Sequence, residues 1–321
     1  MLIDIGAILI GFVLLVWGAD RFIMGAASLA RNLGISPLII GLTIVGFGTS
    51  APEILVSAVA AWQGNPGLSV GNAIGSNIAN IALILGITAL IMPLRVHSNI
   101  LRREFPILLA ITLFTLILML DMELGRLDGV LLLTGLAVML YWMVSIARRP
   151  SEKDPIKAEI DAELPDQMST RKAMMWLGIG LVILLISSRL LVWGAVNIAQ
   201  DLGVSDLVIG LTIVAIGTSL PELAAAIISA LKKEHDIAIG NIIGSNMYNL
   251  LAVLSMPALI SPFTLERVVL TRDFPIMMGL TLALFAMAYG FKTDGRINRF
   301  EGLLLFGSFI AYQLYLYIHS M

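Results

Sequence analysis

The chain has 321 residues, of which 58% are hydrophobic and only 13% are charged. Because soluble domains carry about 25% charged residues, this composition indicates an integral membrane protein. The net charge of −2 says little about partners, since the charges lie in short loops. The absence of cysteine excludes disulfides, thiolate metal sites and cysteine catalysis.

The hydrophobic residues fall into ten segments of the kind that span a membrane, each near the required length of roughly 20 apolar residues. The first segment lacks the positive start and the cleavage site of a signal peptide, so we expect it to remain in the mature protein. The first and sixth segments are long for a bilayer, which indicates tilted helices. The expected spans are residues 2–30, 37–62, 69–93, 103–121, 127–147, 173–200, 206–231, 236–260, 270–290 and 301–318.

A charged linker, 148–172, divides the chain into two halves, residues 1–147 and 173–321. The halves repeat each other in a constant register that aligns position 38 with position 207. LIIGLTIVGFGTSAPE (38–53) matches LVIGLTIVAIGTSLPE (207–222) at 12 of 16 positions, and in the same register VGNAIGSNIAN (70–80) matches IGNIIGSNMYN (239–249) at seven of 11. A repeat that holds its register this long is a strong signal of two related structural units.

Basic residues predict the orientation. If the N-terminus lies outside, 15 lysines and arginines fall in inside loops and three in outside loops, which fits the excess of positive charge on the cytoplasmic side. Linker 148–172 is then cytoplasmic and both termini lie outside. Five spans per half is an odd number, so the halves insert with opposite topology. This inverted-repeat plan is typical of secondary transporters, which bind substrate near the midplane at the repeat interface.

The repeated motif places one carboxylate, Glu53 or Glu222, near the middle of the second and seventh spans. A charge at this depth costs several kcal/mol and usually marks a functional site. Arg21 and Arg189 are the candidate intramembrane partners, but they do not occupy equivalent positions, so symmetric pairing with the two glutamates fails. We therefore expect the glutamates to act on a substrate.

The prolines of the same motif predict a break in each helix. Pro52 and Pro221 have no N–H, so the carbonyls of Gly48 and Gly217 lose their usual helical donors. The hydroxyls that follow each glycine can cap a restarted half-helix. Broken helices at membrane depth line cavities, and the freed carbonyls, hydroxyls and carboxylate are the oxygen ligands that hard cations such as Ca²⁺ prefer. These hydroxyl residues are Thr49, Ser50, Thr218 and Ser219.

The third and eighth spans supply a second polar set. Three residues spaced four apart share one helix face in each span, Asn72, Ser76 and Asn80 in the first and Asn241, Ser245 and Asn249 in the second. For Asn72 and Asn241, hydrogen bonding between packed helices is at least as good an explanation as ion binding. We expect the deeper members, which are Ser76, Asn80, Ser245 and Asn249, to be ligands.

Charge counting narrows the substrate. Two ionised glutamates carry −2, which one Ca²⁺, two monovalent cations or two protons neutralise. An uncompensated charge of −2 inside the membrane is energetically unfavourable, so the protein should rarely change access while the site is empty. This favours exchange over uniport. The chain has no Walker A motif, so ATP-driven pumping is unsupported.

GTSAPE (48–53), GTSLPE (217–222) and the two GSN segments resemble the alpha repeats of the cation/calcium antiporter superfamily, in particular its prokaryotic sodium/calcium exchangers. The resemblance covers nearly the whole chain. It implies that Ca²⁺ is exchanged for about three Na⁺, a transfer of net charge that responds to voltage. It also implies that the carbonyls of Gly46 and Ala215 are ligands, together with Glu53, Glu222, Thr49, Thr218, Ser76, Ser245, Asn80 and Asn249.

This sequence departs from the family pattern at two equivalent positions. The family often has Asp at one of them, whereas here both are Asn, Asn80 and Asn249, so these positions supply no third carboxylate. The proton/calcium branch typically has Gly-Asn-Ala before its glutamate, so Gly-Thr-Ser-x-Pro argues against protons as the main coupling ion. The resemblance further implies that spans one and six slide against the rest of the protein.

The sequence thus predicts an all-α membrane protein with ten transmembrane helices in two inverted five-helix repeats, with helices two and seven broken. We expect a secondary antiporter that extrudes Ca²⁺ against Na⁺ across the plasma membrane of a prokaryote, with no enzymatic activity, cofactor, nucleic-acid partner or obligate protein partner. The alternatives are an H⁺/Ca²⁺ antiporter of the same superfamily and a cation channel with paired glutamates.

Overall fold

The computed structural model describes residues 2–35, 37–96, 98–147, 168–202, 215–289 and 295–320. Most of the charged linker and the first part of the seventh expected span lie outside these residues. Segments labelled η are π-helical. Helices dominate the described chain. They are α1 (Leu2–Leu33), α2 (Pro37–Ile40), η1 (Gly41–Val45), α3 (Gly46–Thr49), α4 (Ala51–Trp62), α5 (Pro66–Ile78), η2 (Ala79–Leu85), α6 (Gly86–Ile91), α7 (Ser98–Met119), α8 (Arg126–Ala147), α10 (Thr170–Asp201), α12 (Ala215–Thr218), α13 (Leu220–Leu231), α14 (His235–Tyr248), η4 (Asn249–Val253), α15 (Ser255–Ile260), η5 (Val269–Asp273), α16 (Phe274–Tyr289) and α17 (Arg299–Ser320).

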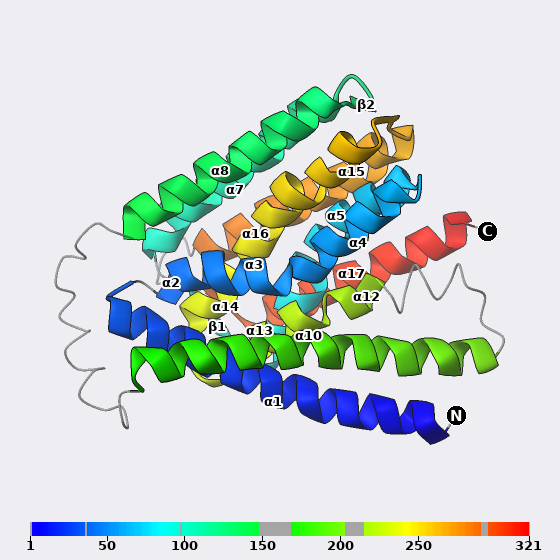
Figure 1. Ribbon diagram of the computed structural model, residues 1–321. Helices are drawn as coiled ribbons and strands as arrows, with labels where there is room; N and C mark the ends of the chain where they lie inside the picture. Colours follow the sequence, from blue (N-terminus) through cyan, green and yellow to red (C-terminus); the bar gives the residue numbers. More distant parts are fainter. Residues whose placement is uncertain are drawn as a thin grey trace.

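The helices agree with the predicted membrane spans. Within the described residues, seven helices are long and apolar enough to cross a bilayer, and the bent pair formed by α2–α3 and α4 makes an eighth. Two shorter apolar helices, Glu104–Met119 within α7 and Leu220–Leu231, coincide with the expected fourth and seventh spans. Both chain ends lie at the same end of the bundle, as an even number of spans requires (Figure 1). The ten-span prediction is therefore consistent with the structure.

Two long helices, α1 and α10, pack against each other along one side of the bundle, while α7 and α8 lie on the opposite side (Figure 1). Each of the two has 32 residues, which confirms the expectation of unusually long first and sixth spans. Outside their mutual interface, they contact the described bundle chiefly through the broken helices α2–α3 and α12–α13. Large parts of both helices are exposed, which suits contact with lipid.

Small residues at intervals of seven explain how closely α1 and α10 approach. Seven residues are almost two helical turns, so Gly11, Gly18 and Gly25 line one face of α1, and Gly180 and Gly194 line the matching face of α10. A Cβ atom at Gly180 would lie 2.4 Å from a backbone nitrogen of α1. The glycines therefore let the two backbones touch along a smooth, apolar interface.

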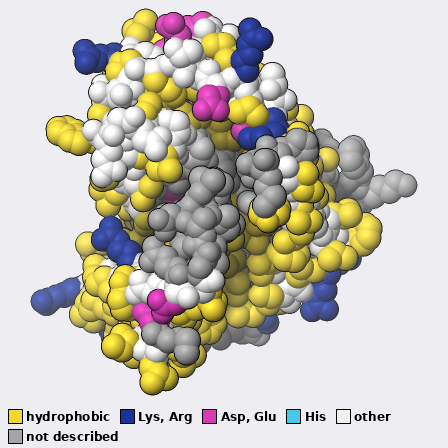
Figure 2. All heavy atoms as spheres, turned by 90° about the vertical axis from the view of Figure 1, so that its right-hand side faces the viewer, with side chains coloured by type: hydrophobic (Ala, Val, Ile, Leu, Met, Phe, Trp, Pro, Cys, Tyr) yellow, Lys and Arg dark blue, Asp and Glu magenta, His cyan; other side chains and the backbone are white. Residues whose placement is uncertain are grey.

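The centre of the bundle is formed by α5–η2–α6 and α14–η4–α15. The most apolar stretch of the second of these spans is entirely buried, and that of the first is mostly buried. Charged side chains lie scattered over the end of the bundle that carries the termini, and hydrophobic side chains continue around its flanks (Figure 2). The polar site residues described below thus sit inside a shell that is apolar toward the membrane.

Two short β-ladders modify the all-α prediction. β1 (Leu94–Val96) pairs antiparallel with β4 (Gly295–Ile297), and β2 (Glu123–Leu124) pairs with β3 (Phe263–Thr264). Each ladder joins a loop of the first half to a loop of the second half. The pairing depends on loops that are distant in the sequence, so no local pattern predicts it. The ladders tie the ends of the two halves together without changing the helical class.

Candidate functional site

The second span breaks where the GTSAPE motif predicts. α3 ends at Thr49 and α4 begins at Ala51, with a bend of 41° between the two parts of the span. Pro52 lies in the first turn of α4, where its missing N–H costs nothing, and Glu53 follows it. A carboxylate in the first turn faces the positive end of the half-helix dipole. The break therefore places a negative charge where the backbone favours it.

The seventh span repeats this break between α12 and α13. Ser219 stands between the two helices, and Glu222 lies in the first turn of α13. The capping prediction is wrong for both serines, because neither Ser50 nor Ser219 makes a side-chain hydrogen bond that caps its helix. The Ser50 hydroxyl instead donates to Glu222 Oε1 at 3.2 Å. An N-cap serine accepts a hydrogen bond from the backbone N–H groups of the first helical turn, whereas the Ser50 hydroxyl donates its proton to a carboxylate of the other half.

The two carboxylates meet in the centre of the protein. Glu53 and Glu222 are both 1% exposed, and their carboxylates are close enough to interact electrostatically. The Thr218 and Ser219 hydroxyls face Glu53, just as Thr49, Ser50 and Ser245 face Glu222. The repeat therefore brings both predicted carboxylates, with hydroxyls from both breaks, into a single cluster.

Asn72 and Asn241 hold the backbone of the two breaks. Asn72 Nδ2 donates to the carbonyl oxygen of Glu53 at 3.1 Å, and Asn241 Nδ2 donates to that of Glu222 at 3.3 Å. The Thr49 hydroxyl also lies 3.0 Å from Asn241 Oδ1, which links the halves. These bonds agree with the structural interpretation of the two asparagines. They fix the position of the glutamate that follows each proline.

A second set of contacts joins the first break to α14. Ser245 Oγ lies 3.5 Å from the carbonyl oxygen of Gly46, the oxygen that the family resemblance proposes as a ligand. The Thr49 hydroxyl lies 3.3 Å from the same oxygen. Ser76 is buried on the equivalent face of α5, and Ala215 is the first described residue of α12. All the predicted site residues therefore belong to the two breaks or to the two central helices beside them.

Asn80 and Asn249 make contacts that the sequence did not reveal. Asn80 Nδ2 donates to Asn246 Oδ1 at 3.0 Å, and Asn249 Nδ2 donates to Asn77 Oδ1 at 3.1 Å. Each bond crosses from one half to the other. Asn77 and Asn246 are the asparagines of the repeated GSN, so their identity in both halves was the available signal. A single sequence cannot show that these two side chains point toward the other half of the protein.

Ser188 of α10 is another polar residue that the sequence analysis missed. Its hydroxyl donates to the carbonyl oxygen of Gly217 at 2.8 Å. This carbonyl is the one that Pro221 deprives of its helical donor. The residue equivalent to Ser188 in the first half is Ala19, which has no hydroxyl. The long helix α10 is thus hydrogen-bonded to the second break through a group that α1 does not offer to the first.

The cluster contains buried oxygens that the described side chains do not satisfy. Buried oxygens normally have hydrogen-bond partners, and a group of exceptions in one place points to a missing ligand. Glu53 is the clearest case, because neither of its carboxylate oxygens has a partner in hydrogen-bonding geometry among the described residues, although the Thr218 and Ser219 hydroxyls face this side chain. The unsatisfied oxygens here are Glu53 Oε1 and Oε2, Glu222 Oε2, Ser219 Oγ, Asn80 Oδ1 and Asn249 Oδ1.

The character of this oxygen set favours particular ions. In the described part of the chain, no group of three or more histidine, cysteine, aspartate or glutamate side chains gathers at one point. Two carboxylates with neutral hydroxyl, amide and carbonyl oxygens suit Ca²⁺ or Na⁺ better than metals that prefer nitrogen or sulfur. Arg21 does not neutralise the pair, since its guanidinium contacts Asp20, Trp17 and Trp176.

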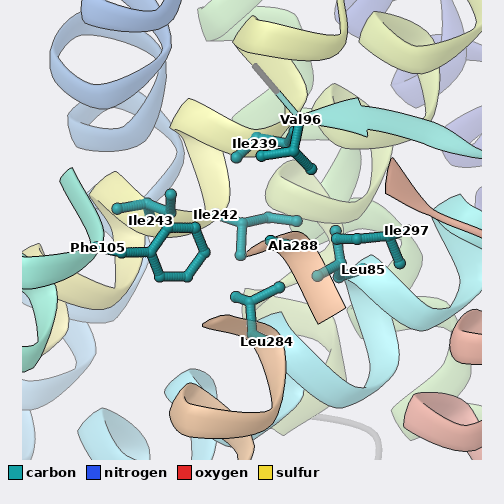
Figure 3. Close-up of a pocket in the computed structure, with 9 residues that line it drawn as sticks. All are labelled: Leu85, Val96, Phe105, Ile239, Ile242, Ile243, Leu284, Ala288 and Ile297. Carbon is teal, nitrogen blue, oxygen red and sulfur yellow. The ribbon is translucent and has the colours of Figure 1, made fainter. Parts of the chain in front are cut away.

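A separate pocket near β1 and β4 has no such chemistry. Figure 3 shows that hydrocarbon side chains line it, with no polar group pointing inward. It offers a cation no ligand. The residues around it are Leu85, Val96, Phe105, Ile239, Ile242, Ile243, Leu284, Ala288 and Ile297.

Comparisons with known proteins match nearly the whole chain. The model of the family described as sodium/calcium exchanger protein matches residues 3–145 and 172–318. CaxA of Alkalimonas amylolytica is 52% identical over 317 residues, covering 99% of each chain. MaX1 of Methanosarcina acetivorans, named a sodium/calcium exchanger, is 29% identical over 97% of each chain. A solved structure of the sodium-calcium exchanger NCX_Mj superposes with a TM-score of 0.83 and 34% identity, covering 97% of each chain.

Proposed function

The chain belongs to the sodium/calcium exchanger family, and on that premise we propose that it is a secondary antiporter that exchanges Ca²⁺ for Na⁺. The observation that carries the proposal is the cluster of unsatisfied buried oxygens around Glu53 and Glu222. A cation is the ligand that such oxygens lack, and two carboxylates match the charge of one Ca²⁺. The direction we propose is Ca²⁺ extrusion across the plasma membrane of a prokaryote.

We assign the ligands by their place in the cluster. The two glutamates supply the charge, and the hydroxyls of both breaks, the deeper side chains of the central helices and two freed carbonyls complete the oxygen shell. Their burial supports this role, because oxygens kept from water bind a cation without competition from solvent. The proposed ligands are Glu53, Glu222, Thr49, Thr218, Ser50, Ser219, Ser76, Ser245, Asn80, Asn249, Gly46 and Ala215.

Exchange follows from charge. With both carboxylates ionised and no cation, −2 would cross the low-dielectric centre of the membrane, which is strongly unfavourable. Ca²⁺ or Na⁺ removes this barrier, so the protein changes access only when it is loaded. If one Ca²⁺ exchanges for about three Na⁺, one net charge moves per cycle and the rate depends on membrane voltage.

The α1–α10 pair is the element that we propose to move. Its internal interface is close-packed through glycines, so the two helices can shift as a unit. Its contacts with the rest of the described protein are mostly to the two broken helices that carry the site. Sliding of this pair would open the oxygen cluster to one side and then to the other. We place linker 148–172 in the cytoplasm and both termini outside, as the basic residues indicate.

Transport by the purified chain in proteoliposomes tests this proposal. Ca²⁺ uptake should require an outward Na⁺ gradient and should increase when the vesicle interior is positive, because three Na⁺ leaving for one Ca²⁺ entering carry net positive charge outward. Uptake driven by an outward H⁺ gradient alone would assign the chain to proton coupling. Uptake with no dependence on a counter-ion gradient would indicate a channel. Either of these results would contradict the proposed function.

A further inference from the structure

Four buried asparagines form the same arrangement twice beside the candidate site. Asn80 pairs with Asn246 and Asn249 pairs with Asn77, at 3.0 and 3.1 Å. All four side chains are at most 2% exposed. The two pairs are equivalent in the repeat, because its register aligns positions 77 and 80 with 246 and 249, and each pair connects the two halves. The two asparagine pairs therefore lie at the interface between the two halves, where the candidate site is also located.

The direction of these hydrogen bonds determines what each amide offers to an ion. One end of an asparagine amide is an acceptor oxygen, which attracts a cation, and the other is an NH₂ group, which repels it. In both pairs, Asn80 and Asn249 use the NH₂ end to reach the partner asparagine. Their oxygens are left buried and without a hydrogen-bond partner among the described residues.

The free oxygens lie on the helix faces that carry the rest of the site. Asn80 follows Ser76 by one turn and Asn72 by two, and Asn72 bonds to the Glu53 backbone. Asn249 follows Ser245 by one turn, and the Ser245 hydroxyl faces Glu222. Both asparagines with a free oxygen therefore share a helix face with residues that contact the two breaks, and their NH₂ groups are bonded to the partner asparagines.

We propose that Asn77 and Asn246 are positioning residues that turn the Asn249 and Asn80 oxygens toward the transported cation. This inference rests on the proposed function and concerns residues that need not touch the ion. Without an acceptor at position 77 or 246, the facing amide is free to flip end for end and present its NH₂ group to the cation. The flip would replace an attractive ligand with a repulsive one.

Met277 fixes the direction of one pair. Asn77 Nδ2 donates to Met277 Sδ at 3.4 Å. A thioether sulfur accepts hydrogen bonds but cannot donate them, so the NH₂ end of Asn77 must face it. The Asn77 oxygen then faces Asn249, whose own oxygen has no partner among the described residues and stays free for a ligand. One chain of donors and acceptors thus runs from a methionine in α16 to the proposed cation.

The test compares two nearly isosteric substitutions at each position. Asn77→Leu and Asn246→Leu remove the acceptor, whereas Asn77→Asp and Asn246→Asp keep an acceptor oxygen at the same place. We expect each leucine variant to bind Ca²⁺ about 10-fold more weakly, the cost typical of a lost buried hydrogen bond. The aspartate variants should regain at least wild-type affinity. Equilibrium dialysis of ⁴⁵Ca²⁺ against the purified protein in detergent measures both.

Double variants distinguish positioning from a general structural role. Asn77→Leu should have no further effect once Asn249→Ala has removed the ligand that it orients, but should keep its full effect with Asn80→Ala. Asn246→Leu should show the reverse pattern, coupling to Asn80 and not to Asn249. A general loss of packing would not follow this crossed pattern, because Asn77 and Asn80 lie in the same membrane span.

The outcomes separate this inference from the proposed function. If the wild-type chain binds Ca²⁺ in competition with Na⁺ but the leucine variants bind equally well, the positioning role is wrong and the exchanger proposal stands. Equal coupling of Asn77 to Asn80 and Asn249 would also overturn it. If a leucine variant does not fold, the comparison of the aspartate variant with wild type still decides, because an aspartate variant with about 10-fold lower affinity contradicts the inference. A wild-type chain that binds no Ca²⁺ would refute both.

Discussion

The two halves of the protein agree in the asparagine contacts around the glutamates and differ where the long helix α10 contacts its broken helix. At the cluster, the asparagine contacts of one half have counterparts in the other, since Asn72 and Asn241 bond to the glutamate carbonyls and the four central asparagines pair crosswise. At the break of the second half, Ser188 bonds to the Gly217 carbonyl, but the equivalent residue of the first half is Ala19.

This difference has a physical meaning. A site that must hold the same ion when it is open to either side benefits from symmetric ligands. If the α1–α10 pair moves as we propose, its contacts with the broken helices change during transport, so they need not be equal in the two access states. A hydrogen bond present at one break only favours the arrangement in which it forms. We therefore infer that the symmetric asparagine contacts serve binding and that the asymmetric hydrogen bond biases the balance between the access states.

The largest expected effect tests the symmetric part. Glu53→Gln and Glu222→Gln each remove half of the charge that neutralises Ca²⁺, so each should lower Na⁺-driven Ca²⁺ uptake by more than about 100-fold. Glu123→Gln is the matched control, because this exposed glutamate lies in β2, between α7 and α8. Near-normal transport in either site variant would mean that the two carboxylates do not share one site.

The glycine interface provides the next prediction. Gly180→Ala places a Cβ 2.4 Å from the backbone nitrogen of Phe22, so α1 and α10 must separate. We expect a loss of about 1–3 kcal/mol in stability, seen as a lower melting temperature in detergent, and slower transport. Gly178→Ala is the control, because nothing lies within 4 Å of the added atom.

The equivalent glycine of the first half refines this prediction. At Gly11 the nearest atom to an added Cβ is Leu191 Cγ, at 2.9 Å, and a leucine side chain can rotate away. Gly11→Ala should therefore be milder than Gly180→Ala. Equal melting temperatures for the two variants would show that the backbone approach at Gly180 is less tight than the structure has it.

The asymmetric hydrogen bond gives a smaller effect. Ser188→Ala makes the second break resemble the first, and losing a hydrogen bond worth about 1 kcal/mol should shift the ratio of the two access states by about fivefold. Because the chain has no cysteine, spin labels can be placed at exposed Val182 and Leu231 to follow the distance between α10 and α13.

A neighbouring serine serves as the control for this shift. The Ser187 hydroxyl donates to Leu184 within its own helix, so Ser187→Ala should leave the distance distribution unchanged. If Ser188→Ala and Ser187→Ala gave the same distributions, the bond to Gly217 would have no role in the balance between states.

The smallest expected effect concerns Met277, whose equivalent in the first half is Leu108. Met277→Leu conserves volume but removes the weak acceptor for Asn77, so Ca²⁺ affinity should fall roughly twofold. Titration of Ca²⁺ binding measures this change. The same substitution should have no effect when Asn77 is already leucine, and an undiminished effect there would assign Met277 to packing alone.

The sequence was sufficient for the plan of the fold and for most of the cluster. Residues 38–53 and 207–222 repeat so closely that the broken helices and both glutamates could be located, and helical periodicity placed Ser76 and Asn80 on one face. These features are local, or they follow from a register that the repeat itself displays. The ligand roles and the boundaries at 147 and 173 stay predictions.

The features that the sequence did not reveal depend on contacts between the halves. Ser50 bonds to Glu222 rather than capping α4, and the acceptors for Asn80 and Asn249 lie on the opposite central helix. The π-helical segments η2 and η4 begin beside these asparagines, where packing rather than residue type sets the winding. Such contacts join residues that are far apart in the sequence, beyond the reach of periodicity or capping rules.

Binding of ⁴⁵Ca²⁺ to the purified chain at increasing Na⁺ concentration tests most directly that both halves build one shared ion site. The account predicts one Ca²⁺ per chain, displaced by Na⁺ with a Hill coefficient above one, and loss of this binding in Glu53→Gln and in Glu222→Gln alike. Ca²⁺ binding that is unaffected by Na⁺, or that is retained in either variant, would contradict the shared ion site.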